Sequence, residues 1–252
     1  MTGFTSEQKF LVTGAGSGIG RSCALLLNRL GASVIGLGRN ADKLAATRAD
    51  CPAPERFFAC SFDLAKNAPE IPELIAGLRK EHGKLSGLCA AAGKFHMDSL
   101  RSFTLAASNE MNLINLQAPV LLAQNFSDRR NCIGAGASIL FIAAFGGVLP
   151  QPGLLSYGAA KAALIAASKS LSKELGPRQI RVNAISPAIV RTPMTEGAYA
   201  GFMGYDVLAA ETPLYPLGLG EPTDIAEMAV FLLSPASRWI TGQNIIMDGG
   251  RF

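Results

Sequence analysis

A glycine-rich turn between a short apolar run and a helical stretch is the feature that most constrains how this chain can fold. Phe10-Leu11-Val12 is typical of a buried strand, and Thr13 to Gly20, with a glycine at every second position from 14, leads into helical residues up to about Leu30. A strand, turn and helix in this order bring backbone N–H groups to a helix N-terminus, where a pyrophosphate can bind. A glycine turn alone also fits an ordinary connection between a strand and a helix.

The rest of the chain alternates between strand-like and helical segments. Further strands are predicted at 32–37, 57–62, 85–92, 137–143, 180–185 and 243–247. Helices are predicted at 71–80, over one or two segments between 99 and 126, and at 157–175, before the stop signal Gly176-Pro177. This alternation predicts right-handed βαβ units, and hence one α/β domain over 1–252 with a Rossmann-like, doubly wound, seven-stranded parallel sheet flanked by helices on both faces.

Charge and cysteine usage exclude several classes of protein. The net charge of +4 over 252 residues is spread along the chain without a dense basic block, which argues against specific nucleic-acid binding. Five cysteines without paired spacing and only two histidines argue against a disulfide framework or a zinc site, and they favour a reducing, cytoplasmic compartment. The N-terminus shows no signal-peptide pattern.

One long uncharged segment has the length of a membrane span. Residues 131–160 contain no charged side chain, but glycines and prolines interrupt them repeatedly. A buried strand followed by an active-site loop explains this segment better, so no membrane partner is expected.

The end of the second predicted strand bears on the choice of dinucleotide. In this type of fold an acidic residue there binds a ribose 2′-hydroxyl, whereas an arginine accommodates a 2′-phosphate. Gly38 and Arg39 occupy the position, and no acidic residue comes before Asp42. The sequence therefore favours NADP(H), the alternative being that Arg39 is a solvated loop residue.

A tyrosine and a lysine four residues apart suggest proton-transfer chemistry. On a helix, Tyr157 and Lys161 share one face, a turn apart. A phenol has an ordinary pKa of about 10, and a neighbouring ammonium lowers it toward the working range by favouring the phenolate. The same spacing also occurs on ordinary amphipathic helices, so the pair alone is weak evidence.

The order of these motifs resembles the short-chain dehydrogenase/reductase family, in its compact single-domain form. The resemblance extends from Phe10 to Gly250, and its other motifs are Asn183-Ala184-Ile185-Ser186-Pro187 and Thr241-Gly242-Gln243 with Asp248-Gly249-Gly250. It implies a nicotinamide-dependent oxidoreductase that acts on a small molecule and forms a homo-oligomer, commonly a tetramer. No metal site is implied.

The resemblance also implies roles for single residues. Tyr157 would be the acid/base residue, Lys161 would hold the nicotinamide ribose, and Asn115 would carry a relay water; Asn112, one turn earlier, is the alternative to Asn115. The cofactor-binding residues expected on these grounds are Gly14, Ser17, Gly18, Ile19, Gly20, Arg39, Asp63, Leu64, Ala91, Gly93, Tyr157, Lys161, Pro187, Val190 and Thr192.

The sequence departs from the family pattern at two places. Ala90-Ala91-Ala92-Gly93 stands where the family usually has Asn-Asn-Ala-Gly, and Ala144 stands where the family has the serine that polarises the substrate carbonyl. Ser138 lies too early and Ser156 is expected to point to another side of its helix. A substrate group, a water or a hydroxyl after Thr195 could replace the missing donor.

Two functions from different classes follow. The first is an NADP(H)-dependent oxidoreductase that interconverts a carbonyl and an alcohol; the second is a cofactor-binding protein with vestigial catalysis, acting as a sensor or partner subunit. A nucleotide-sugar epimerase or dehydratase is weaker, because little chain remains after Asp248 for a substrate domain. A lid is predicted at 195–216, and its apolar side chains either favour a nonpolar or ring-shaped substrate or pack the lid onto the sheet.

Overall fold

The computed structural model describes residues 3–199 and 207–252. Within these residues seven parallel strands form one sheet with the order β3-β2-β1-β4-β5-β6-β7. The strands are β1 (Lys9–Thr13), β2 (Ser33–Gly38), β3 (Phe57–Ser61), β4 (Gly87–Ala90), β5 (Ser138–Ile142), β6 (Arg181–Pro187) and β7 (Asn244–Met247). The predicted Rossmann-like fold class is confirmed.

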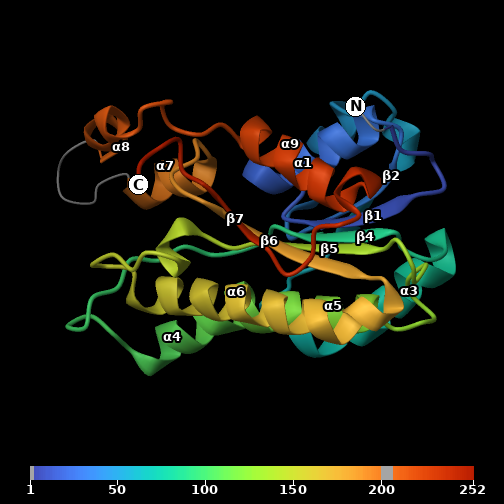
Figure 1. Ribbon diagram of the computed structural model, residues 1–252, viewed down its shortest axis with the longest axis horizontal. Coiled ribbons are helices and arrows are strands. Elements are labelled where there is room, and N and C mark those ends of the chain that lie inside the picture. The colour runs from blue at the N-terminus through green and yellow to red at the C-terminus, as the bar shows by residue number, and fades with distance from the viewer. Residues whose placement is uncertain (1–2, 200–206) are drawn as a thin grey trace.

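Helices cover both faces of the sheet, which is seen edge-on across the middle of Figure 1. One face carries α1 (Gly18–Arg29), α2 (Ala41–Ala49) and α9 (Pro222–Leu233). The other carries α3 (Ile71–His82), α4 (Leu105–Asn112), α5 (Ala118–Phe126) and α6 (Leu155–Leu175). Because successive side chains of a strand point to opposite faces, Phe10 and Val12 of β1 join the first core and Leu11 joins the second.

The strand order reverses beside β1, which pairs with β2 on one side and β4 on the other. In open parallel sheets a ligand-binding crevice forms at this point, outside the carboxyl ends of the strands. The segment after β4 leaves the sheet at Ala91, earlier than predicted, and enters that crevice.

The helical region predicted between 99 and 126 begins at Leu105 and is interrupted by a π-helical turn, Leu113–Gln117. Proline has no N–H, so Pro119 cannot pair with the carbonyl of Asn115 four residues earlier, as an α-helix requires. π-helical turns often occur at functional sites. This one lies where Asn115 reaches the crevice.

The predicted lid lies only partly within the described residues. Its first part belongs to α7 (Pro193–Tyr199) and a later part to α8 (Val207–Glu211), while residues 200–206 lie outside the described chain. Among the described helices, none has both the length and the apolar character needed to cross a membrane.

Candidate active site

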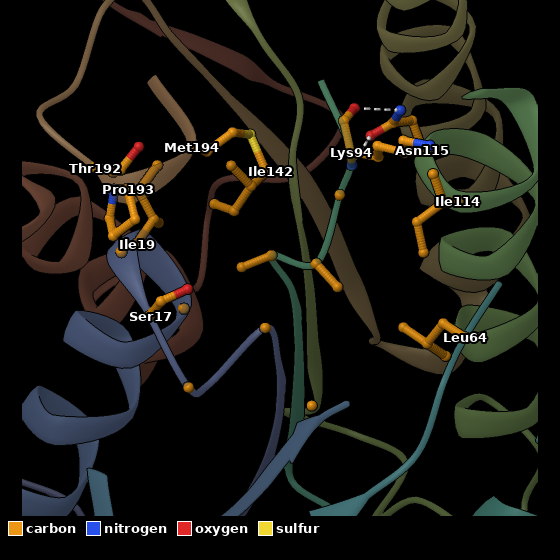
Figure 2. Close-up of a pocket in the computed structure, with 18 of the residues that line it drawn as sticks. Ser17, Ile19, Leu64, Lys94, Ile114, Asn115, Ile142, Thr192, Pro193 and Met194 are labelled. Carbon is orange, nitrogen blue, oxygen red and sulfur yellow. Dashed lines mark hydrogen bonds between the residues drawn. The ribbon is translucent and has the colours of Figure 1, made fainter. Parts of the chain in front are cut away.

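A cavity of about 440 Å³ opens at the carboxyl ends of the central strands. Figure 2 shows residues from α1 and from the segment after β6 on one side of it, and residues from the π-helical turn on the other. All of the site residues expected from the sequence line this single cavity: Gly14, Ser17, Gly18, Ile19, Gly20, Arg39, Asp63, Leu64, Ala91, Gly93, Asn115, Tyr157, Lys161, Pro187, Val190 and Thr192. Asn112, the alternative to Asn115, is not among its lining residues.

The glycine turn fits a dinucleotide, because its backbone passes where side chains cannot. Gly14 has φ +70°, and a Cβ there would lie 3.1 Å from the backbone of Ala92. A Cβ on Gly20 would lie 2.5 Å from the carbonyl oxygen of Gly14. The turn therefore packs against the strand ends and leads directly into the N-terminus of α1, the arrangement that suits a pyrophosphate.

The helix α6 presents Tyr157 and Lys161 to the cavity. Lys161 is 4% exposed, and its Nζ donates to the Ile142 carbonyl at 2.8 Å. The same Nζ lies 5.8 Å from the centroid of the Tyr157 ring, and Phe95 packs edge-on against that ring at 4.9 Å. Burial lowers the pKa of Lys161 from its ordinary 10.5 to about 8. The ammonium therefore titrates near neutral pH, beside the phenol whose ionisation it favours.

The buried ammonium predicts a specific dependence of stability on pH. Because the pKa of Lys161 is lower in the folded chain than in the unfolded chain, the unfolded state binds more protons between pH 8 and 10.5, so this group makes folding more favourable as pH rises through that range. The free energy of unfolding of the wild type, minus that of Lys161→Met, should rise by about 3 kcal/mol over this interval. Denaturant titrations at several pH values measure it.

A matched control lies on the same helix. Lys169 is exposed, so Lys169→Met should leave the pH dependence of the wild type unchanged. If the free energy of unfolding of Lys161→Met changed with pH in the same way as that of the wild type, burial would not lower the pKa of Lys161.

The side chain of Asn115 holds the segment that follows β4. Its Oδ1 accepts from the backbone N–H of Lys94 at 3.2 Å, and its Nδ2 donates to the Lys94 carbonyl at 2.8 Å and to the Met111 Sδ at 3.0 Å. A Cβ on Gly93 would lie 2.8 Å from Asn115 Oδ1. A side chain at this position would displace the Asn115 amide from its contacts with Lys94, so glycine suits the site although Ala90 and Ala91 replace the asparagines of the family pattern.

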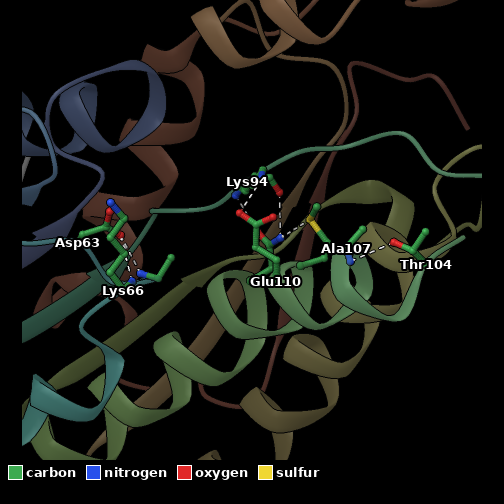
Figure 3. A network of polar contacts seen from close by, with 9 residues as sticks. Asp63, Lys66, Lys94, Thr104, Ala107 and Glu110 are labelled. Atoms are coloured by element: carbon green, nitrogen blue, oxygen red, sulfur yellow. Dashed lines mark hydrogen bonds and ion pairs between the residues drawn. The ribbon is translucent and has the colours of Figure 1, made fainter.

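The other end of the cavity is basic. Arg39 and Lys43 both line it, while Asp63 Oδ1 accepts from the backbone N–H groups of Ala65 and Lys66, which holds the turn after β3 (Figure 3). Lys43 was not predicted from the sequence, because the motif for recognition of the ribose covers only the end of β2 and Lys43 lies in the following helix, α2.

The hydroxyl groups considered as replacements for the family serine donate to other partners. Ala144 and Tyr157 both line the cavity. Ser138 donates to the Leu232 carbonyl at 3.0 Å, and Ser156 donates to Asp98. Thr195 donates to the Val190 carbonyl at 2.6 Å. None of these three described hydroxyls takes the place of the family serine, and the loop after Thr195, the other expected source of a hydroxyl, lies partly outside the described residues.

An ion pair at the cavity mouth was not foreseen from the sequence. Lys94 Nζ lies 2.6 Å from Glu110 Oε1, and both side chains are about half exposed (Figure 3). Met194 and Ile114 also line the cavity. No motif marks these residues, because their place depends on the path of the chain after β4 and β6.

Comparison with known proteins agrees with this geometry. A family model described as enoyl-(acyl carrier protein) reductase matches residues 14–251. An NAD-dependent glycerol dehydrogenase from Listeria innocua is 33% identical over 97% of this chain and 94% of its own, and a 3-oxoacyl-(acyl-carrier-protein) reductase from Thermotoga maritima is 30% identical over 95% of this chain and 96% of its own.

Two solved structures that resemble this chain are also dehydrogenases or reductases. A short-chain dehydrogenase from Burkholderia cenocepacia in complex with NADP superposes with a TM-score of 0.86 at 28% identity, covering 98% of each chain. A short-chain dehydrogenase/reductase from Brucella melitensis superposes with a TM-score of 0.90, covering 100% of this chain and 99% of its own. Sequence, fold and cavity together place this chain in the short-chain dehydrogenase/reductase family of oxidoreductases.

Proposed function

We propose that the protein is an NADP(H)-dependent oxidoreductase that interconverts a carbonyl and an alcohol. The observation that carries this proposal is the placement of Tyr157 beside the buried Lys161, in the cavity that also holds the glycine turn. The nicotinamide, when bound, supplies or takes up the hydride. The residues of the chain must bind the dinucleotide, orient the substrate and move one proton.

Each proposed role follows from the position of the residue. In reduction, Tyr157 donates its hydroxyl proton to the substrate oxygen while the carbonyl carbon accepts the hydride; in oxidation both transfers reverse. The ammonium of Lys161 stabilises the phenolate that remains after proton donation. Asn115 keeps the backbone at Lys94 in place, and its position in the cavity lining supports the relay-water role that the family resemblance implies.

The preference for NADP(H) is supported by two cations, one directly after β2 and one in the first turn of α2. Arg39 and Lys43 line the cavity there, whereas Asp42 does not. A 2′-phosphate is recognised well by such cations. The relatives differ in this respect, since one is described as NAD-dependent and one solved structure contains NADP, so the proposal depends on this chain's own residues.

Removal of the arginine should therefore change cofactor selectivity. Arg39→Leu should weaken NADPH binding about tenfold, since a hydrogen bond to a charged group contributes on the order of 1.5–3 kcal/mol in favourable cases and less when exposed. NADH binding should stay within about twofold. Fluorescence titration of both nucleotides measures this effect, and Arg48→Leu is the control, because Arg48 lies on α2 outside the cavity. Equal losses for NADPH and NADH would contradict the assignment.

A second candidate function rests on Ala144. Without the serine hydroxyl the chain could bind NADP(H) and act as a sensor or partner subunit with vestigial catalysis. Tyr157, Lys161 and Asn115 are all present in the cavity, which favours the enzyme. Assay of the wild-type protein with NADPH and a panel of carbonyl compounds distinguishes the two functions.

The proposal includes a homo-oligomer in the cytoplasm. Ala159, Ala162 and Ala166 leave small exposed side chains on the outer face of α6, which would let a second copy pack closely against it. The five cysteines are free thiols, as expected in a reducing compartment. Light scattering of the purified protein would establish the size of the assembly.

A further inference from the structure

The first turn of α6, which carries Tyr157, is capped by a residue distant in sequence. Leu154 precedes the helix and offers no capping side chain. Instead, Asp98 Oδ1 accepts from the backbone N–H of Ser156 at 3.0 Å, and Asp98 Oδ2 accepts from the Ser156 hydroxyl. The Asp98 carboxylate is only 3% exposed. A carboxylate buried to this extent requires donors, and here Ser156 alone provides two.

The backbone strengthens this attachment. The N–H of Asp98 donates to the Gly153 carbonyl at 2.9 Å, and the Leu155 N–H donates to the Asp98 carbonyl at 3.3 Å. The main chain and the side chain of one residue therefore both fix the start of α6. These two bonds form an isolated parallel bridge between Asp98 and Leu154.

The segment that ends at Asp98 also touches the other proposed site residues. Its first residue, Lys94, is held by Asn115, and Phe95 packs against the Tyr157 ring. Figure 3 shows Lys94 above the helix that carries Glu110. Residues 94–98 thus connect Asn115, Tyr157 and the N-terminus of α6.

We propose that Asp98 is a positioning residue for the reaction, which fixes the first turn of α6 and so aligns Tyr157 with the substrate. This inference rests on the proposed function and adds a residue that no motif marks. Because Tyr157 directly follows Ser156, any movement of the first turn moves the phenol. Misplacement of a reacting group by a small distance is costly in rate.

The charge of Asp98 adds a measurable signature. A helix N-terminus is partially positive, and the carboxylate neutralises it one residue before Tyr157. Among the described residues, the other charged or titratable groups of this part of the site include Lys161 on α6, the ion pair of Lys94 with Glu110, and His96 in the segment 94–98. Removal of the Asp98 charge leaves these groups in place and favours the Tyr157 phenolate.

Asp98→Asn tests the proposal, because it keeps the size and an acceptor for the Ser156 N–H. The pKa of Tyr157, taken from phenolate absorbance as the wild type minus Tyr157→Phe, should fall by about one unit. In carbonyl reduction kcat should fall about tenfold, while KM and the NADPH dissociation constant stay within about twofold.

The matched control is Asp224→Asn. Asp224 also caps a helix with its carboxylate, accepting from the Glu221 N–H at 2.7 Å, but its helix α9 carries no residue of the cavity. An unchanged Tyr157 pKa in Asp98→Asn, or a change matched by Asp224→Asn, would overturn the proposal. The absorbance titration needs no turnover, so it separates this proposal from a failure of the proposed oxidoreductase activity.

Discussion

Replacing Tyr157 by Phe is expected to lower kcat for carbonyl reduction by about 10²- to 10⁴-fold, the range typical of a lost general acid. The ring and its contact with Phe95 remain in this variant, and only the hydroxyl that donates the proton is removed. Binding of NADPH should change by less than about threefold, because the glycine turn and the basic end of the cavity are unaltered. Steady-state kinetics and a binding titration on the same preparation measure both quantities.

The matched control for this variant is Tyr215→Phe. Tyr215 is buried and accepts from the Ile189 N–H at 3.4 Å, but it does not line the cavity. This control should keep its kcat within about threefold. Activity in Tyr157→Phe equal to that of the control would remove Tyr157 from the mechanism.

Restoring the missing hydroxyl should have the opposite effect. Ala144→Ser is expected to raise kcat by about 10- to 10²-fold, approaching the 10²–10³ that one oriented oxyanion donor typically contributes. The reason is that Ala144 and Tyr157 line the same cavity, while Ser138, Ser156 and Thr195 donate their hydroxyls elsewhere. The gain should appear in kcat more than in KM, because the developing oxyanion exists only in the transition state.

Ala144→Gly is the control for altered space at this position. It removes a methyl group without adding a donor, so it should not raise kcat. A rate for Ala144→Ser that equals or falls below the wild-type rate would mean that the substrate itself, or a residue outside the three tested hydroxyls, already supplies the hydrogen bond.

The fold could be predicted because its signals are local. Each strand is a short apolar run between turn residues, and the stop signal Gly176-Pro177 follows the end of α6 at Leu175. Four of the described α-helices were not predicted, namely α2, α9 and the short α7 and α8 in the region expected to form a lid. In α2 only Leu44 and Thr47 are buried, which leaves little periodicity to detect, whereas α9 does carry a usable signal in the capping box of Glu221 and Asp224.

Some residues of the site could likewise be predicted from local motifs, whereas others could not. Gly14, Tyr157 and Lys161 belong to motifs with fixed spacing, and all three line the cavity as expected. Asp98 acts on a helix 58 residues later in the chain, and its partner is set by the path of the intervening segments. No local pattern contains that information, so only the tertiary structure shows it.

Our central claim is that the protein binds NADPH in this cavity and that hydride passes from NADPH to the carbonyl of a substrate. In the most direct test, the purified wild-type protein is incubated with NADPH and a panel of ketones, hydroxyketones and 3-oxoacyl thioesters. The amount of NADPH consumed is then compared with the amount of alcohol formed. We expect at least one carbonyl to be reduced, with one alcohol formed per NADPH oxidised. Tight binding of NADPH without reduction of any member of the panel would contradict this claim and favour a cofactor-binding protein, and activity that appears only in Ala144→Ser would show that its catalysis is vestigial.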